Sequence, residues 1–354
     1  MKSILLTGGG SAGHVTTNLA LIPHFINEGW DLAYIGSQKG IEKDLITQYN
    51  CVRYYSIPTG KLRRYFDWRN FSDPFNSLKG VFQSYNIIKS INPDIVFSKG
   101  GYVSVPVVLA AWMNNIPVII HESDTTPGLA NKLSIPFAKY VCTTFPDMGY
   151  IPTKKHIYIG PIIRDDLKKG DAKFALQICD FKDHKPILLI IGGSLGSKII
   201  NDIIRNSLDE LTTFFQIIHI CGKGNVDNSI HYNDYKQFEY VTNLLPDLLA
   251  IADLVISRAG SNTIFELLSL NKPMLLVPLA KNKSRGDQIL NARYFEQQGF
   301  AEILYEEDLN KSNLKDKTLS VYQNKNKYIN NQKKFNFRDP IQQILELINK
   351  EAKI

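Results

Sequence analysis

One local pattern occurs twice in this chain: a short apolar run, a cluster of glycines and then a stretch with helical character. The first copy is SILLTGGGSAGH at residues 3–14, and the second is PILLIIGGSLGS at residues 186–197. A strand that leads through a tight glycine turn into a helix is the opening unit of a Rossmann-like fold. Two copies in one chain predict two such domains.

The other apolar runs fit the same architecture in both halves. Short runs bounded by glycine or proline alternate with longer helical stretches, which is typical of βαβ units and a parallel sheet. A helix is expected at 14–28. Strands are expected at residues 3–7, 32–35, 95–98, 118–121 and 140–143, and again at 215–220, 238–241, 254–257 and 274–277. The predicted fold class is therefore α/β.

Glycine and proline punctuate the chain at 160–161, which places a domain boundary near this point. The N-terminal domain is expected to cover residues 1–163, and the C-terminal domain residues 164–337. A polar stretch rich in lysine and asparagine precedes the last segment, residues 338–354. That segment has apolar residues at helical spacing, which predicts an amphipathic helix. The helix can dock on either domain, including back on the first.

Composition excludes several classes of protein. Of the 354 residues, 44% are hydrophobic and 21% are charged, which is too apolar for a disordered chain. The sequence contains no apolar run of about 18 residues, so no membrane span is predicted. The first residues are typical of a buried strand and not of a signal peptide. The four cysteines lie far apart, which disfavours zinc and disulfides and fits a reducing cytosol. The net charge of +7 suits nucleic acid, anionic lipid or a phosphorylated substrate.

The first glycine cluster has the spacing of a nucleotide-binding loop. Gly8, Gly10 and Gly13 fit G-x-G-x-x-G between a strand and a helix, where glycine allows a tight turn and helix amides attract an anion. A dinucleotide site also needs an acid after the second strand, and Gly36 and Ser37 stand there. NAD binding is therefore disfavoured. A tight connection without a ligand stays the alternative for both glycine loops.

Several polar residues lie where helices are expected to begin. His14 follows the first glycine loop and is a candidate general base, with a capping or merely exposed histidine as the alternative. In SRAGSNTIFELL a helix begins near Asn262, beside a possible diphosphate site, and carries Glu266 in its first turns. The Glu266 carboxylate can accept hydrogen bonds from a ribose diol, or it can simply compensate the helix dipole. The RGDQ sequence adds Asp287 and Gln288, as ligands or as a solvated turn.

Six motifs occur in an order that points to one family. They are TGGGSAGH, SKGGYVSVPVVLAAW, HESD followed by PGLANK, GGSLGS, SRAGSNTIFE and RGDQ. Together they resemble the MurG family of glycosyltransferases, in the form typical of Gram-positive bacteria. The resemblance covers nearly the whole chain. Each motif alone is unspecific, whereas the ordered set is highly specific.

The resemblance implies a GT-B fold, with two Rossmann-like domains and a deep cleft between them. It implies an inverting hexosyltransferase of peptidoglycan synthesis. The enzyme would move N-acetylglucosamine from UDP-N-acetylglucosamine to the 4-hydroxyl of a lipid-linked N-acetylmuramyl-pentapeptide, in a β-1,4 link. The donor is expected mainly on the C-terminal domain. No cofactor is required, and no metal is implied.

The family pattern also assigns site residues, position by position. His14 is the favoured base for the acceptor hydroxyl, and Asp124 is an alternative base or an orienting group. The chain departs from the pattern at Ser11 and Ala12, which replace Thr and Gly, and at Asp124, where Asn is frequent. The donor is expected at Arg164, Ser194, Val241, Ser261, Asn262, Thr263, Glu266 and Gln288. The acceptor diphosphate is expected at Gly10, Ser11, Gly13, Gly101 and Tyr102.

A lipid-linked acceptor implies an enzyme bound peripherally to the cytoplasmic side of the cell membrane. Basic and aromatic residues gather at 61–71, which is typical of an interfacial surface. The apolar stripe that follows at helical spacing is by itself more typical of a core face. The expected membrane contacts are Arg63, Arg64, Trp68, Phe75, Phe82 and Trp112. Cell-wall synthesis proteins are candidate partners; nucleic acid is not, because no nucleic-acid motif accompanies the aromatics.

Three other functions stay open at this point. Another GT-B enzyme of UDP-sugars, such as a glycolipid glucosyltransferase or an epimerase, would share the donor site. A nucleotide-sugar sensor would bind the donor without turnover, and would keep its function after His14 or Asp124 is replaced. An NAD-linked oxidoreductase is the third, and the missing acid after the second strand argues against it.

Overall fold

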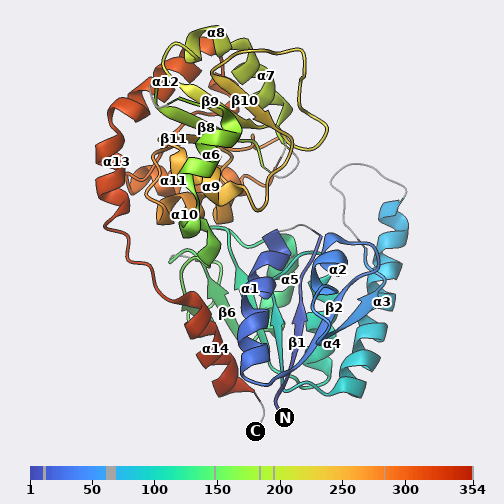
Figure 1. Cartoon of the computed structure of the whole chain (residues 1–354). Helices are drawn as coiled ribbons and strands as arrows, with labels where there is room; N and C mark the ends of the chain where they lie inside the picture. Colours follow the sequence, from blue (N-terminus) through green and yellow to red (C-terminus); the bar gives the residue numbers. More distant parts are fainter. Residues whose placement is uncertain are drawn as a thin grey trace. The chain divides into compact units, whose positions relative to one another are not determined.

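The computed structural model describes residues 1–10, 13–60, 69–146, 149–182, 185–193, 196–282 and 284–352, with the side chains of 69–74 left aside. The chain forms two compact units, of which one comprises residues 1–162 and 338–354 and the other residues 163–337 (Figure 1). Each unit is built around one parallel sheet with helices on both faces.

Seven parallel strands form the sheet of the first unit, in the order β3-β2-β1-β4-β5-β6-β7. They are β1 (Ser3–Thr7), β2 (Asp31–Ser37), β3 (Val52–Ile57), β4 (Ile95–Ser98), β5 (Val118–Glu122), β6 (Tyr140–Thr143) and β7 (His156–Tyr158). The helices are α1 (Gly13–Asn27), α2 (Ile41–Ile46), α3 (Arg69–Ile91), α4 (Ser104–Met113), α5 (Leu129–Ser134) and α14 (Pro340–Glu351). Both faces of the central strands are apolar, as a sheet covered by helices on both sides requires.

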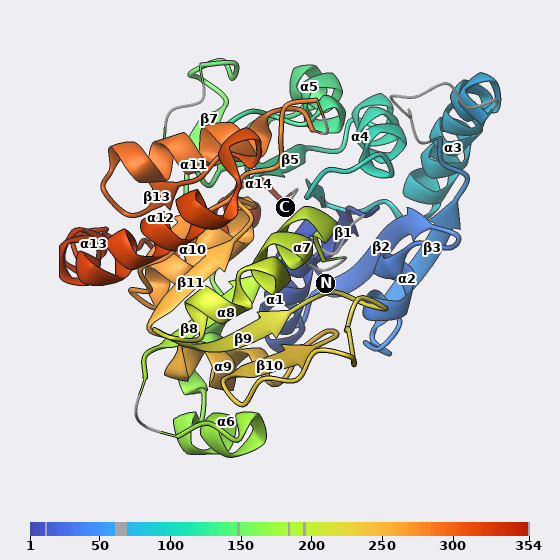
Figure 2. The same cartoon turned by 90° about the horizontal axis from the view of Figure 1, so that it is seen from above.

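Strand alternation divides the apolar residues of the first unit between two helical layers. Ile4 and Leu6 of β1 pack in one cluster with Phe25 of α1. Leu5, between them, is equally buried and faces the opposite layer, which contains α3 and α4. The helices α3 and α4 lie side by side (Figures 1 and 2).

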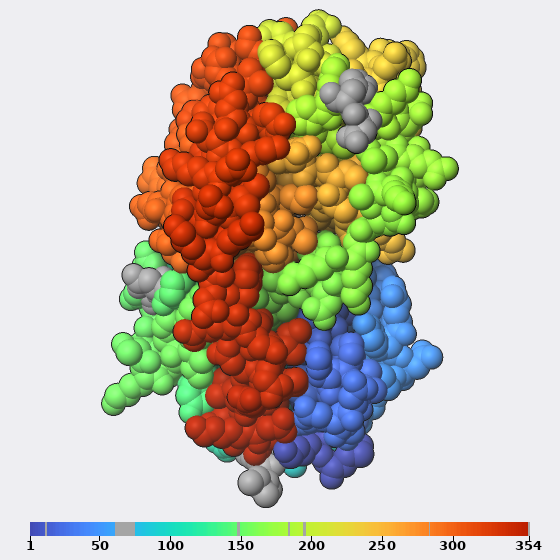
Figure 3. Space-filling view, turned by 60° about the vertical axis from the view of Figure 1, so that its left-hand side comes forward, coloured from blue at the N-terminus to red at the C-terminus, as the bar shows by residue number. Residues whose placement is uncertain are grey.

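The last helix, α14, packs on the unit in which the chain begins. Its buried apolar stripe consists of Ile344, Leu345 and Ile348, which join the cluster of β1 and α1. Lys2 Nζ donates a hydrogen bond to Asn349 Oδ1 at 2.8 Å, and Asn349 Nδ2 donates to Glu28 at 3.1 Å. Figure 3 shows this helix, in red, beside the N-terminal segment in blue. Packing thereby decides a placement that the helical spacing had left open.

Six parallel strands form the sheet of the second unit, in the order β10-β9-β8-β11-β12-β13. They are β8 (Ile187–Ile191), β9 (Gln216–Ile220), β10 (Tyr235–Phe238), β11 (Leu254–Ser257), β12 (Met274–Leu276) and β13 (Glu302–Ile303). The helices are α6 (Ala172–Cys179), α7 (Lys198–Asn206), α8 (Leu208–Leu211), α9 (Leu245–Ile251), α10 (Ser261–Ser269), α11 (Asp287–Gln297), α12 (Lys311–Gln323) and α13 (Lys325–Gln332). The lysine- and asparagine-rich stretch is thus mostly helical, and its residues Leu314, Val321 and Tyr328 are buried in the core of this unit.

The strand expected at 238–241 is wrong in its position along the chain. The strand is β10, Tyr235–Phe238, and it ends where its partner β9 ends, since Phe238 pairs with Ile220. Cys221 N–H donates to Phe238 O at 2.8 Å at the end of this pairing, and Tyr240 beyond it is exposed. The apolar alternation after Phe238 therefore belongs to a loop that leads into α9.

Candidate active site

Both sheets reverse their winding next to the strand that precedes a glycine loop. In the first unit the reversal falls between β1 and β4, and in the second it falls between β8 and β11. Open α/β sheets bind ligands outside the carboxyl ends of the strands at this point. The loops after these four strands are therefore the candidate ligand-binding loops of the two units.

Two glycine loops fit tightly against each other at the switch point of the first unit. Gly9 N–H donates to Gly100 O at 3.3 Å, and Gly10 and Gly101 have positive φ angles of 87° and 86°. A Cβ at Gly101 would collide with the carbonyl oxygen of Gly9, and one at Gly10 would collide with the ring of Tyr102. Three of the residues expected at the acceptor diphosphate thus lie together.

A buried glutamate that the sequence did not single out supports this loop from α2. Glu42 is fully buried, and its Oε1 accepts from Ser37 N–H at 3.0 Å and from Ser37 Oγ at 2.5 Å. Its Oε2 accepts from Gly10 N–H at 3.3 Å. An acidic side chain therefore does lie at the end of β2, but its oxygens already accept hydrogen bonds from the protein's own N–H and O–H groups. Glu42 lies five residues after Ser37 in the sequence, so a search for an acid directly after β2 does not find it.

His14 is the second residue of α1, directly after Gly13, and is half-buried. It lies at the carboxyl end of β1, where the helix begins. This position agrees with a general base at a ligand-binding loop. The other candidate base, Asp124, follows the end of β5, and β4 lies between β1 and β5 in the sheet.

Glu122, the last residue of β5, organises the loop that carries Asp124. Its Oε1 accepts from Asp124 N–H at 3.0 Å, while its Oε2 accepts from Gly128 N–H at 3.0 Å and from Asn131 Nδ2 at 2.8 Å. Three N–H groups thus donate to the two oxygens of one buried side chain. The backbone of Asp124 is thereby held beside the Glu122 carboxyl group.

The second glycine loop is held against the neighbouring strand. Gly196 has a φ of 74°, and a Cβ there would collide with the carbonyl oxygen of Cys221 after β9. Ser197 caps α7 by accepting from Ile200 N–H. Close packing of backbone on backbone leaves no space for a side chain, so glycine is required at position 196.

Arg258, after β11, binds this loop and two further segments of the same unit. Its Nη2 donates to Ser197 Oγ at 2.7 Å and lies 2.5 Å from the carboxylate of Glu306, and its Nη1 donates to Val277 O at 3.0 Å. Both charged side chains are nearly buried. Arg258 lies within the SRAGS motif, but the sequence gives no signal that it pairs with the distant Glu306.

Glu266 and Arg164, two of the expected donor ligands, lie close enough in the second unit for their charges to interact. Burial raises the pKa of Glu266 to about 7, and the positive charge of Arg164 partly opposes this shift. Arg164 itself makes a two-point ion pair with Asp166, with Nη2 to Oδ2 at 2.6 Å and Nε to Oδ1 at 3.1 Å. Glu266 is therefore a carboxyl group whose protonation changes near neutral pH.

The other described donor candidates lie at helix starts and strand ends of the same unit. Ser261 is the buried first residue of α10 and is followed by the half-buried Asn262 and Thr263. Val241 follows β10 and is half-buried. Gln288 is the second residue of α11, and its Oε1 accepts from Leu279 N–H at 3.0 Å, which holds the loop after β12.

Five predicted site residues lie outside what the structure describes. They are Ser11, Arg63, Arg64, Trp68 and Ser194. Within the described part of the chain, no group of three or more His, Cys, Asp or Glu residues is placed to hold a metal ion.

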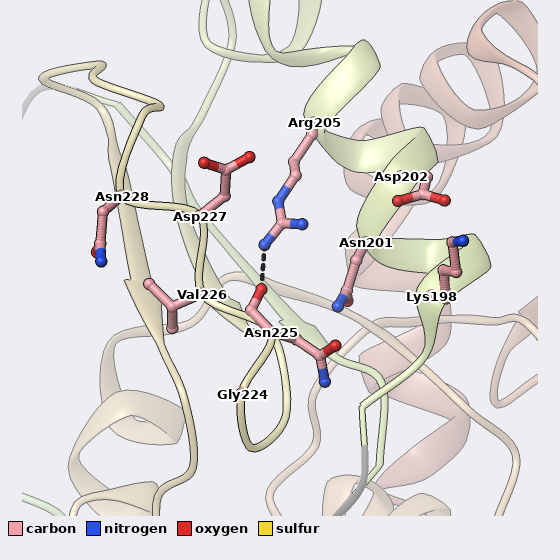
Figure 4. A pocket seen from close by; sticks show the side chains of 9 residues that line it. All are labelled: Lys198, Asn201, Asp202, Arg205, Gly224, Asn225, Val226, Asp227 and Asn228. Atoms are coloured by element: carbon pink, nitrogen blue, oxygen red, sulfur yellow. Dashed lines mark hydrogen bonds between the residues drawn. The ribbon is translucent and has the colours of Figure 1, made fainter.

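A polar pocket of about 370 Å³ lies beside α7 in the second unit (Figure 4). Arg205 reaches across it to donate to the carbonyl oxygen of Asn225 and to Gln237 Oε1, the latter at 2.9 Å. Its lining consists of Lys198, Asn201, Asp202, Arg205 and residues 224–228. Of the predicted donor ligands that the structure describes, none lines it.

An apolar surface patch covers α3 and the end of α4, contrary to the core face that the stripe alone suggested. Phe75 is 71% exposed, Phe82 61% and Trp112 54%. Asn114 Nδ2 donates to Tyr85 O at 3.4 Å, which joins the two helices near Phe82 and Trp112. The stripe points outward because α3 already packs against α4 with its other side. No helix among the described residues is both long enough and apolar enough to cross a bilayer.

Two doubly wound units, each with a glycine loop at its switch point, define a GT-B glycosyltransferase fold. The chain belongs to glycosyltransferase family 28: the N-terminal domain of that family matches residues 4–143, and its C-terminal domain matches residues 187–346.

Curated relatives share more than half of their residues with the chain. A protein of Geobacillus thermodenitrificans (strain NG80-2) is 56% identical over 354 residues, which cover 99% of both chains. One of Clostridium botulinum (strain Kyoto / Type A2) is 55% identical over 355 residues and 100% of both. Each is named UDP-N-acetylglucosamine–N-acetylmuramyl-(pentapeptide) pyrophosphoryl-undecaprenol N-acetylglucosamine transferase. The crystal structure of Acinetobacter baumannii MurG is 26% identical, with a TM-score of 0.78 over 99% of this chain and 100% of that one.

Proposed function

We propose that the chain transfers N-acetylglucosamine from UDP-N-acetylglucosamine to the lipid-linked N-acetylmuramyl-pentapeptide, the step that completes the disaccharide of the peptidoglycan precursor. The observation that carries this proposal is 56% identity, over nearly the full length of both chains, to a relative named for that reaction. The test is a transfer assay with labelled donor and a short-chain analogue of the acceptor. UDP-glucose with diacylglycerol runs in parallel, and label moving only in that pair would overturn the acceptor assignment.

The chain's own residues supply the chemistry of an inverting transfer. A base on the first unit, His14 or Asp124, takes the proton of the acceptor hydroxyl as its oxygen attacks the anomeric carbon. The bond between that carbon and the diphosphate breaks, and UDP leaves with the electron pair. Amides at the start of α10 and the Arg164 guanidinium are expected to stabilise the charge on the leaving diphosphate. Nothing in this sequence of steps calls on a bound metal ion.

Replacing Glu266 by alanine is expected to weaken UDP-N-acetylglucosamine binding by about 10–100-fold, because a hydrogen bond to a charged group contributes about 1.5–3 kcal/mol. The rate at saturating donor should change less, since the ribose is remote from the reacting carbon. Calorimetric titration of the donor, with kcat measured separately, checks this. An unchanged dissociation constant would remove the ribose role.

The pH dependence of donor binding gives a second readout of the same group. The folded pKa of Glu266 is raised to about 7, so the carboxylate is lost as pH falls below that value. The donor dissociation constant should therefore rise as pH is lowered from 8 to 6, by up to about tenfold per pH unit at the acid end. In E266Q, which does not titrate, this dependence should disappear. A variant that keeps the wild-type pH profile would assign the titration to another group.

We further propose that the patch of Phe75, Leu78, Phe82 and Trp112 is the contact with the cytoplasmic face of the membrane. These side chains are exposed on α3 and α4, and the basic Lys79 is exposed among them. Exposed apolar side chains with a lysine among them can insert into an interface while the charge meets anionic headgroups. The membrane location rests on this patch and on the lipid-linked substrate.

Replacing both Phe75 and Phe82 by serine is expected to weaken binding to anionic lipid vesicles by at least about tenfold, since each buried Phe contributes about 1.5–3 kcal/mol. Vesicle co-sedimentation measures this. The matched control is serine at Phe174 and Phe214, which are similarly exposed on the second unit. Equal binding by both double variants would show that the patch is not the contact.

A further inference from the structure

Three polar side chains are buried among the apolar residues of the second unit, and the proposed reaction does not use them. They are Asn201 of α7, His219 of β9 and Tyr235 of β10, which are 2%, 0% and 7% exposed. Strand alternation places His219 on the same face as Ile217, which belongs to the core cluster of this unit. A buried polar group costs free energy unless it is hydrogen-bonded, so the partners of these three side chains indicate what they do.

The three side chains form one continuous chain of hydrogen bonds. His219 Nδ1 lies 2.8 Å from Tyr235 Oη, and His219 Nε2 lies 3.0 Å from Asn201 Oδ1. Asn201 Nδ2 donates to the carbonyl oxygen of Cys221 at 2.9 Å. Cys221 is also held by β10, because its N–H donates to Phe238 O at 2.8 Å. The chain of bonds thus runs from β10 through β9 and α7 to the backbone that follows β9.

The chemistry of the partners fixes the direction of every bond. The Cys221 carbonyl needs a donor, so the amide nitrogen of Asn201 faces it and the amide oxygen faces His219. An amide oxygen only accepts, so His219 carries its proton on Nε2. Burial lowers the pKa of His219 to about 3, and the positive charge of Arg205 adds to this shift, so the ring is neutral and Nδ1 is an acceptor. Tyr235 O–H therefore donates to Nδ1, and each proton points towards Cys221.

The chain of bonds ends where the second glycine loop packs against the backbone after β9. The Cys221 carbonyl oxygen is the atom with which a Cβ at Gly196 would collide, so its position limits how closely the loop can approach. The backbone N–H of Asn201 donates to Ser197 O at 2.8 Å. Asn201, in the first turn of α7 (Figure 4), therefore holds both the end of the loop and the carbonyl against which the loop packs.

We propose that Asn201 is a positioning residue for donor binding, because it sets the second glycine loop through the Cys221 carbonyl. His219 and Tyr235 orient Asn201 and act only through it. The identity of the donor as UDP-N-acetylglucosamine rests on the proposed function, whereas the positioning of the loop does not. An apolar side chain at position 201 would leave the carbonyl without this donor, and one at 219 would leave the amide free to turn. The ligand would then have to order the loop, which costs affinity.

Donor affinity tests the proposal. N201L and H219L should each raise the dissociation constant of UDP-N-acetylglucosamine about tenfold or more, because each leaves a buried polar group unsatisfied. The value of kcat at saturating donor should change by less than about threefold, since the loop does not touch the acceptor hydroxyl. H219Q should restore the wild-type affinity, because its amide can donate in place of Nε2–H.

The matched control is Q332L, which removes another buried amide of the same unit. Gln332 Nε2 donates to Lys272 O at 2.9 Å and to Phe300 O at 2.8 Å, before the amino ends of β12 and β13. The glycine loop lies at the carboxyl end of β8, the opposite edge of the sheet. Q332L should therefore lose stability and keep the wild-type donor affinity. Equal affinities in N201L and Q332L, or in H219L and H219Q, would overturn the proposal.

Hydrogen exchange of the Gly196 amide tests the loop without the donor. This N–H donates to Gly193 O at 2.9 Å, and N201L should speed its exchange about tenfold relative to Q332L. Equal exchange in the two variants would overturn the proposal. If N201L does not fold, Y235F takes its place, since it removes only a hydroxyl group, and wild-type exchange in Y235F would overturn the proposal. If the wild type binds no UDP-N-acetylglucosamine, the proposed function fails and the exchange rates still decide the positioning of the loop.

Discussion

Replacing His14 by alanine is expected to lower kcat for sugar transfer by about 10²–10⁴-fold, the usual contribution of a positioned general base. His14 lies at the start of α1, where the glycine loop of β1 ends, and is half-buried. Donor binding should not change, because the expected donor ligands all lie in the second unit. Single-turnover transfer and calorimetric titration of UDP-N-acetylglucosamine separate the two effects.

The same helix provides the control for this variant. His24 is exposed near the end of α1, and H24A should keep wild-type kcat. D124N completes the comparison, because Asp124 is the other candidate base. If H14A stays within fivefold of the wild type while D124N loses most of the rate, the base is Asp124. Loss of donor binding in H14A would mean that the variant disturbs more than proton transfer.

Replacing Gly196 by alanine is expected to cause a large loss of stability, for two separate reasons. A non-glycine residue at positive φ costs about 1–2 kcal/mol, and displacing packed backbone adds about 1–3 kcal/mol. Here φ is 74° and the added Cβ would collide with the carbonyl oxygen of Cys221. Donor affinity should fall as well, because Ser197 and the start of α7 move with the loop.

A change at Gly193, in the same loop, separates the cost of the backbone conformation from the cost of the collision. Its φ is 97°, but a Cβ there meets no atom of the described residues within 4 Å. G193A should therefore lose only the conformational part, about 1–2 kcal/mol in the free energy of unfolding. Denaturant unfolding of both variants measures the difference. Equal losses would show that the loop moves away from Cys221 without cost, so close packing would not be the reason for glycine at 196.

Local patterns predicted much of each sheet. The strands at Ser3–Thr7, Ile95–Ser98, Tyr140–Thr143 and Leu254–Ser257 agree with the structure residue for residue, because buried parallel strands are continuous apolar runs. The family resemblance is confirmed by the match of both family 28 domains. Short or half-exposed strands were not predicted: β3, β7 and β13 lack such an apolar run. The strand β10 was predicted three residues too late in the chain.

Residues that act through distant partners were not predictable from the sequence. Glu42 fills the place of the missing acid after β2 only because α2 folds back over Ser37 and Gly10. Arg258 meets Glu306 across the second sheet. No spacing rule connects such positions.

The sequence by itself determined the two α/β units, the glycine loops and the family, because strands, tight turns and helix starts are local properties of adjacent residues. Tertiary structure decided which side of each amphipathic segment is buried. The stripe of α3 is exposed because another side of the helix meets α4, whereas that of α14 is buried against β1 and α1. The hydrophobic pattern of a helix shows that one face is apolar, but only the packing of the whole chain decides which surface, if any, covers that face.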